Sequence, residues 1–157
     1  MTVKERLHNA DKRILAALCG GRVLELNDAA EDSAALVPLT LQDDEGRRIY
    51  ERSLRFVMLL ALREMYPGQQ VRIEYSVGYG VFVRLPGVTL GEDDLRRVAT
   101  IMRRLIDADL PFEKKTWRLD EAIRYFEQDG QQDKVALLQR RPFSYFQMYH
   151  CNGMWEY

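Results

Sequence analysis

Residues 56–62 read Phe-Val-Met-Leu-Leu-Ala-Leu, and this apolar run is closed on its two sides by Arg55 and Arg63. Seven apolar residues are too few to cross the hydrocarbon core of a bilayer, which is about 30 Å thick and needs about 20 helical residues. The run therefore predicts the middle of a helix that is buried on most of its sides, and not a membrane span.

Flanking residues suggest where this helix begins and ends. Gln42-Asp43-Asp44 offers carboxylates for an N-terminal cap, and Pro67-Gly68 is typical of a helix end. We therefore expect the helix to extend from about Asp44 to Tyr66. Three further patterns mark turns or caps. They are Cys19-Gly20-Gly21, Gly78-Tyr79-Gly80 and the capping-box spacing Thr89-Leu90-Gly91-Glu92.

Hydrophobic periodicity supplies the remaining elements. Strands are expected over residues 14–18, 22–26, 35–41, 71–75, 81–85, 112–118 and 143–150. Shorter helices are expected over residues 3–12, 92–107, 119–128 and 131–140. Pro38 favours an edge position for its strand, because proline lacks the N–H that a central strand must donate. The pattern predicts an α+β fold, with a long central helix packed on an antiparallel sheet.

Composition limits the possible functions. The chain has 157 residues, 46% of them hydrophobic, and a net charge of −1. The hydrophobic fraction is typical of a globular protein. The near-neutral charge excludes nucleic-acid binding through bulk positive charge, although it does not exclude binding through a local basic face. The charged start of the chain lacks the apolar stretch of a signal peptide, so we expect a reduced, cytoplasmic protein. We expect two units, residues 1–43 (β-rich) and residues 44–157 (α+β).

No catalytic motif is evident. None of the ten glycines precedes a lysine, so the phosphate-binding loop of nucleotide kinases is absent. The whole supply of Cys and His is His8, Cys19, His150 and Cys151, which is too scattered for a zinc site. His150 and Cys151 are adjacent and point to opposite faces of a strand, so His150 is wrongly directed to activate the Cys151 thiol. We expect no catalytic residue, metal or cofactor in this chain.

Arginines cluster on two predicted helices. Arg48, Arg52 and Arg55 share a face of the long helix, and Arg96, Arg103 and Arg104 share a face of the helix over residues 92–107. Such a face is either solvated or contacts RNA or another phosphate-bearing ligand, and the sequence leaves both interpretations open.

Several strings, taken in order, resemble a known domain. They are residues 52–56, 63–67, 80–82, 90–95, 120–122, 134–138 and 151–153. Together they resemble the second N-terminal domain of threonyl-tRNA synthetase, which hydrolyses mischarged serine from tRNA. Residues 14–41 look like the later strands of a TGS domain, a small β-grasp module, so the resemblance implies a partial β-grasp unit before the long helix.

Three strings are closer to a related family. Residues 44–54, 106–112 and 133–135 resemble bacterial nucleoside (uridine) kinases, in which TGS and synthetase-like domains precede an ATP-binding kinase domain. This resemblance implies an accessory or regulatory module, with a C-terminal kinase domain in the same polypeptide as partner. The alternative is a tRNA-binding or aminoacyl-tRNA editing domain. The implied ligand is tRNA or a nucleotide, and no membrane is implied.

The editing quartet of the synthetase domain is largely lost. Its first two histidines fall on Arg52 and Phe56, and its Cys-His pair falls on Cys151 and Trp155. Arg, Phe and Trp offer no lone pair for a base or a metal ligand, so the resemblance implies a disabled editing site. Lys134 matches a lysine of the editing cleft. We expect these five residues to converge on one cleft as its binding residues.

Overall fold

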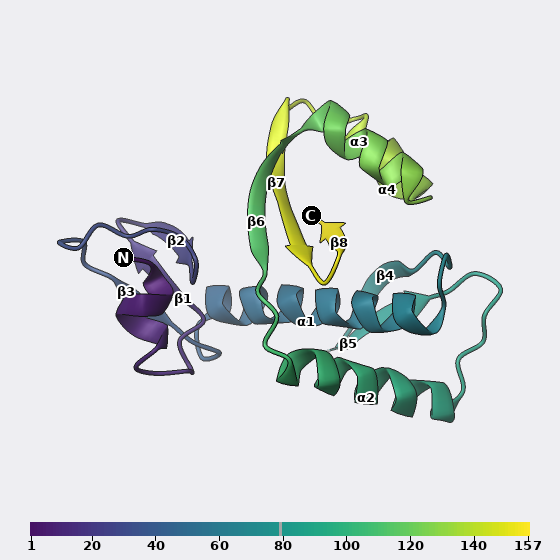
Figure 1. The fold of residues 1–157 in the computed structure, drawn as a ribbon, viewed down its shortest axis with the longest axis horizontal. Coiled ribbons are helices and arrows are strands. Elements are labelled where there is room, and N and C mark those ends of the chain that lie inside the picture. Colours follow the sequence, from purple (N-terminus) through teal and green to yellow (C-terminus); the bar gives the residue numbers. More distant parts are fainter. Residues whose placement is uncertain (79) are drawn as a thin grey trace. The chain divides into compact units, whose positions relative to one another are not determined.

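Helix α1 (Asp44–Met65) contains the apolar run, and its bounds agree with the prediction to within one residue. The computed structural model describes residues 1–78 and 80–157, and it has the predicted α+β class, with helices and antiparallel sheets (Figure 1). The chain divides into two compact units, Met1–Arg55 and Phe56–Tyr157. The boundary that the sequence placed between residues 43 and 44 stays a prediction.

The N-terminal unit is a small antiparallel sheet with a short helix. Its elements are η1 (Lys4–His8), β1 (Ala16–Cys19), β2 (Arg22–Glu25) and β3 (Val37–Leu39), with strand order β2-β1-β3. Gly20 and Gly21 have φ of 54° and 80°, the left-handed conformation that a tight hairpin needs. Pro38 lies in β3 at the sheet edge, as predicted. That this unit is a TGS-type β-grasp stays a prediction.

The start of α1 is fixed by Thr40 and Asp43. The Asp43 carboxylate accepts a hydrogen bond from the Thr40 backbone N–H at 2.7 Å, and the Asp43 carbonyl accepts one from the Arg47 N–H at 2.9 Å. Gly46 follows in the first turn, and a Cβ there would lie 2.0 Å from the Thr40 carbonyl oxygen. Only glycine therefore fits at this point of the helix.

The C-terminal unit contains the rest of α1 and eight further described elements. They are β4 (Arg72–Val77), β5 (Gly80–Arg84), α2 (Glu92–Asp107), β6 (Glu113–Arg118), α3 (Leu119–Gln128), α4 (Gln132–Leu138), β7 (Tyr145–Cys151) and β8 (Met154–Glu156). The strands of this unit form two antiparallel sheets, β4-β5 and β6-β7-β8, whereas the sequence pattern predicted one sheet. The turn predicted at Gly78-Tyr79-Gly80 includes residue 79, which lies outside the described residues.

Two local predictions are wrong. The sequence analysis ended on one aromatic strand, but the chain turns back at Asn152 and Gly153, whose φ values are 47° and 80°, and forms β8. The capping box expected at Thr89 lies two residues later. The Gly91 backbone N–H donates to the Asp94 carboxylate at 2.9 Å, and α2 begins at Glu92.

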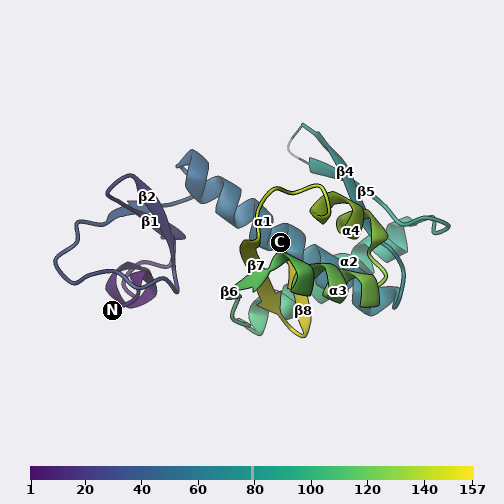
Figure 2. The ribbon, with the colours of Figure 1, turned by 90° about the horizontal axis from the view of Figure 1, so that it is seen from above.

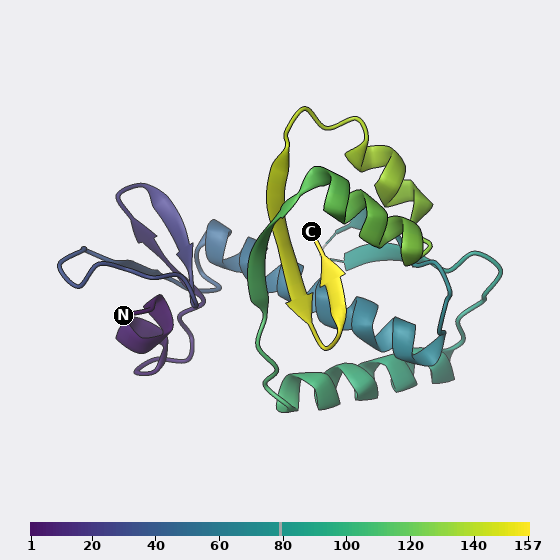
Figure 3. The same ribbon diagram turned by 45° about the horizontal axis from the view of Figure 1, so that its top comes forward.

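The β6-β7-β8 sheet has a hydrophobic cluster on each face. On one face, Cys151 and Met154 pack with α1 and α2. On the other face, Met148 packs with Phe126 of α3 and Leu138 of α4. Figure 3 shows the two helices, in green, beside this sheet. Because side chains alternate along a strand, this one sheet separates the unit into two cores. In the described ranges, no helix combines the length and apolar character that a bilayer crossing demands.

Candidate functional site

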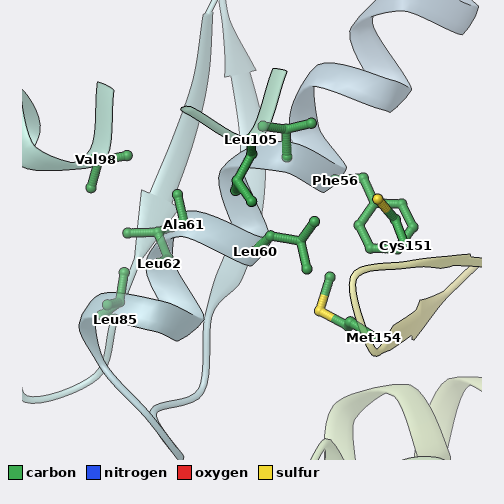
Figure 4. Close-up of a cluster of buried hydrophobic side chains, with 10 residues drawn as sticks. Phe56, Leu60, Ala61, Leu62, Leu85, Val98, Leu105, Cys151 and Met154 are labelled. Atoms are coloured by element: carbon green, nitrogen blue, oxygen red, sulfur yellow. The ribbon is translucent and has the colours of Figure 1, made fainter. Parts of the chain in front are cut away.

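Phe56 and Cys151, two of the five candidate residues, meet in one buried hydrophobic cluster (Figure 4). Phe56 lies on α1 and Cys151 at the end of β7, and the cluster also includes Leu60 and Met154. The Phe56 ring packs on Phe112 with 5.3 Å between ring centroids. These positions, which resemble two members of the editing quartet, therefore lie in a close-packed hydrocarbon core.

This burial makes Cys151 unreactive. Desolvation raises the pKa of the Cys151 thiol above its ordinary value of 9.0, which disfavours the nucleophilic thiolate. The His150 ring lies on the other face of β7, where it packs on Trp155 at 4.8 Å and lies 3.6 Å from the Glu113 carboxylate. The His150 imidazole is therefore directed away from the Cys151 thiol, as the alternation of side chains along the strand predicted.

Lys134 is held on α4 by an ion pair with Glu156 of β8. Their side chains are only 24% and 14% exposed. The ammonium also lies 5.0 Å from the centroid of the Phe126 ring and 5.8 Å from that of Tyr157. Burial lowers the pKa of Lys134, and the negative charge of Glu156 opposes that decrease. A phosphate that bound this lysine would have to compete with Glu156.

Trp155 belongs to the opposite face of the sheet from Cys151. Its ring packs on Trp117 with 4.8 Å between centroids, and its backbone N–H donates to the Tyr125 hydroxyl at 3.0 Å. It packs against the cluster around Phe126. The expected convergence is therefore only partial, because Phe56 with Cys151 and Lys134 with Trp155 lie in different clusters.

Arg52 lies on α1, one helical turn before Phe56, and is assigned to the N-terminal unit. Its side chain is exposed. Arg55, three residues further along the helix, pairs with Glu51 at 3.8 Å, a contact weak enough to be exchanged for another anion. Arg52 and Arg55 therefore form a cationic strip on α1, and whether that strip binds a ligand stays a prediction.

The sequence analysis missed a charge network next to Lys134. Arg63 of α1 donates to both carboxylate oxygens of Asp129, at 3.1 Å for one of them, and the Gln131 amide donates to the same carboxylate. These contacts tie α1 to the link between α3 and α4. No local signal predicts a pair 66 residues apart, although an arginine that closes an apolar run does indicate a cation at the core boundary.

Among the residues outside position 79, no three His, Cys, Asp or Glu side chains gather into a group that could hold a metal ion. The arrangement offers a packed core, an internally paired lysine and exposed arginines. These groups suit binding of an anion.

Comparison with known proteins points to tRNA ligases. The chain is 31% identical over 147 residues to the threonine–tRNA ligase of Acidiphilium cryptum, a match that covers 92% of this chain and 23% of the ligase. It is 30% identical over 144 residues to that of Granulibacter bethesdensis, covering 90% and 22%. It is 27% identical over 132 residues to that of Carboxydothermus hydrogenoformans, covering 83% and 21%. No family model matches the chain.

The chain thus spans between 21% and 23% of the length of these relatives. The similarity supports the synthetase-like part of the resemblance stated above. It gives no support to the link with nucleoside kinases, nor to a kinase domain as partner.

Proposed function

We propose that this chain is a tRNA-binding module, related to a region of threonine–tRNA ligases, that has lost the hydrolytic chemistry of an editing domain. The similarity over 83% to 92% of the chain supports the relationship to tRNA ligases. The nucleoside-kinase interpretation has no comparable support.

One observation supports the proposed loss of hydrolytic activity. Phe56 and Cys151 lie together in a hydrophobic cluster, at positions that resemble a histidine and the cysteine of the editing quartet. Aminoacyl ester hydrolysis needs a water held and deprotonated beside the ester, and a phenyl ring and a buried neutral thiol do neither. A site of this kind can retain binding while chemistry is lost.

The binding strip proposed for tRNA phosphates is Arg52 and Arg55 on α1. Both guanidiniums are permanently charged, and their planar forks match phosphate oxygens. Lys134 is the weaker candidate, because Glu156 already neutralises it within a partly buried pair. A local strip of this kind agrees with a chain of net charge −1 that has no general affinity for polyanions.

Titration with tRNA at two salt concentrations tests the binding. We expect detectable affinity at low salt that falls as salt rises, because each neutralised phosphate releases counterions. Arg52→Gln and Arg55→Gln should each flatten the salt slope by about 1. Arg13→Gln is a matched control, because Arg13 is highly exposed and lies outside both arginine clusters, and it should leave the slope unchanged. Undetectable binding at low salt would remove the proposal.

A deacylation assay tests the loss of chemistry. Seryl-tRNA incubated with the chain should hydrolyse at the spontaneous rate, and Cys151→Ala should not alter that rate. Steady turnover that disappears in Cys151→Ala would instead establish a working deacylase.

A further inference from the structure

Hairpin β4-β5 has two unlike faces. Register pairs Ile73 with Val83 on one face, and Val83 packs against the core around α1. Tyr75 pairs with Phe82 on the outer face, where the same register also places Arg72 opposite Arg84. Figure 2 shows β4 and β5 extending away from the helices of the C-terminal unit. On this outer face the Tyr75 and Phe82 rings are exposed, whereas Arg72 at the start of β4 contacts Asp133 of α4.

The outer face carries a stacked aromatic pair in water. The Tyr75 and Phe82 rings are 5.0 Å apart between centroids, with only 8° between their planes. Tyr75 is 56% exposed and Phe82 40%. Most of the other aromatic contacts of the described residues are tilted or edge-on and lie in or beside the two cores. In this parallel pair each ring covers one face of the other, so a further ring can extend the stack on an outer face of the pair.

Cations lie beside this pair on the same face. The Arg84 guanidinium pairs with Glu74 at 3.1 Å, and the Arg72 guanidinium pairs with Asp133 at 2.9 Å. Both arginines are roughly half exposed, so these pairs contribute little and can be exchanged for a phosphate at small cost. An apolar protein partner would have to bury both guanidiniums together with the rings, which is unfavourable.

We propose that the outer face of β4-β5 binds one or two unpaired nucleotides of RNA, with a base that extends the stack of Tyr75 and Phe82 and with phosphates held by Arg72 and Arg84. Stacking of bases on exposed aromatic side chains is sequence-tolerant and suits single-stranded ends. This inference rests on the proposed tRNA-binding function and assigns it a second surface.

The test uses the full chain and two RNA hairpins, one with an unpaired 3′ tail that carries 2-aminopurine and one blunt-ended. We expect the tailed RNA to bind at least fivefold more tightly than the blunt RNA, with quenching of the 2-aminopurine. Combined Tyr75→Ala and Phe82→Ala should remove both the preference and the quenching. Tyr75→Phe should retain them, and Arg84→Gln should flatten the salt slope by about 1.

Tyr145→Ala is the matched control, because Tyr145 is 58% exposed on the other sheet, and it should change neither readout. Equal binding of tailed and blunt RNA would overturn this inference while leaving the tRNA-binding proposal intact. Absence of all RNA binding at low salt would overturn both. A concentration-dependent dimer in light scattering that the double alanine variant abolishes would assign the face to a second copy of the chain, and would also overturn the inference.

Discussion

The two sheets of the C-terminal unit are built from similar alternating strands, yet they are covered differently. The β6-β7-β8 sheet packs against α1 and α2 on one face and against α3 and α4 on the other. Hairpin β4-β5 is covered on one face and leaves Tyr75 and Phe82 stacked in water. The buried aromatic residues of the first sheet stabilise the fold, whereas the Tyr75 and Phe82 rings of the second remain exposed. The following predictions test this division, beginning with the largest effect.

Phe126→Ala should give the largest loss of stability. Phe126 is fully buried between α3, α4 and the β6-β7-β8 sheet, and its truncation leaves a cavity that the packed surroundings cannot fill. We expect the free energy of unfolding to fall by about 3–5 kcal/mol, measured by urea denaturation. The matched control is Phe143→Ala, since Phe143 is 46% exposed, and it should cost far less. A loss below about 1 kcal/mol would mean that α3 and α4 are not packed on the sheet.

Lys134→Met should give the next largest effect. The variant leaves the Glu156 carboxylate partly buried without its cation, which we expect to cost about 1–3 kcal/mol by thermal or urea unfolding. Lys134→Met combined with Glu156→Leu should recover much of that loss, because the double variant no longer buries an unpaired charge. An additive double variant would show that the two side chains do not interact.

Sequence patterns predicted much of this architecture for a physical reason. The apolar run of α1, the glycine pair after β1 and the helix end at Pro67-Gly68 are local signals, because each acts within a few residues. The missed β8 also has a local signal, since Asn-Gly favours the tight turn seen at residues 152–153. The strand that follows this turn has only three residues, which is too short to show a periodic pattern.

The candidate site was harder to predict than the fold. Cys151 and Trp155 are four residues apart and would share a face of a single continuous strand. A turn separates them, however, and they lie on opposite faces of the sheet. This placement can be predicted only when the turn is known. The pairing of Lys134 with Glu156, and of Arg63 with Asp129, depends on tertiary packing that no local pattern encodes. The resemblance identified candidate positions, but burial of Phe56 and Cys151 and the pairing of Lys134 depend on the tertiary structure.

The Cys151 thiol should give a smaller effect that depends on pH. Its pKa is raised in the folded state by burial, so the folded protein keeps a proton that the unfolded chain loses above about pH 9. The stability that the neutral thiol contributes is therefore fully present below pH 9 and is lost as pH rises through the folded pKa. The free energy of unfolding then decreases by at most about 1.4 kcal/mol per pH unit.

Urea denaturation between pH 8 and 10 measures this slope. Cys151→Ala should lower stability at pH 8 but flatten the decrease at higher pH, whereas Cys19→Ala should keep the wild-type slope because Cys151 is retained. Lys134, Tyr125 and Tyr157 also titrate in the alkaline range, but they are common to all three proteins and cancel in the comparison. Identical slopes in the wild type and Cys151→Ala would show that the thiol is not buried.

The smallest effect is expected at the exposed aromatic pair, and it measures the contrast between the two sheets directly. A double-mutant cycle of Tyr75→Ala and Phe82→Ala should give a coupling of about 0.5–1 kcal/mol, because the stack is made in water and neither ring fills a core. The same cycle on Trp117 and Trp155, whose centroids are 4.8 Å apart beside Phe126, should give a larger coupling and larger single losses. Equal couplings in the two cycles would contradict the division between a covered and an uncovered sheet. In that case the outer face of β4-β5 would contribute to folding, and the exposure of Tyr75 would no longer argue for a binding role.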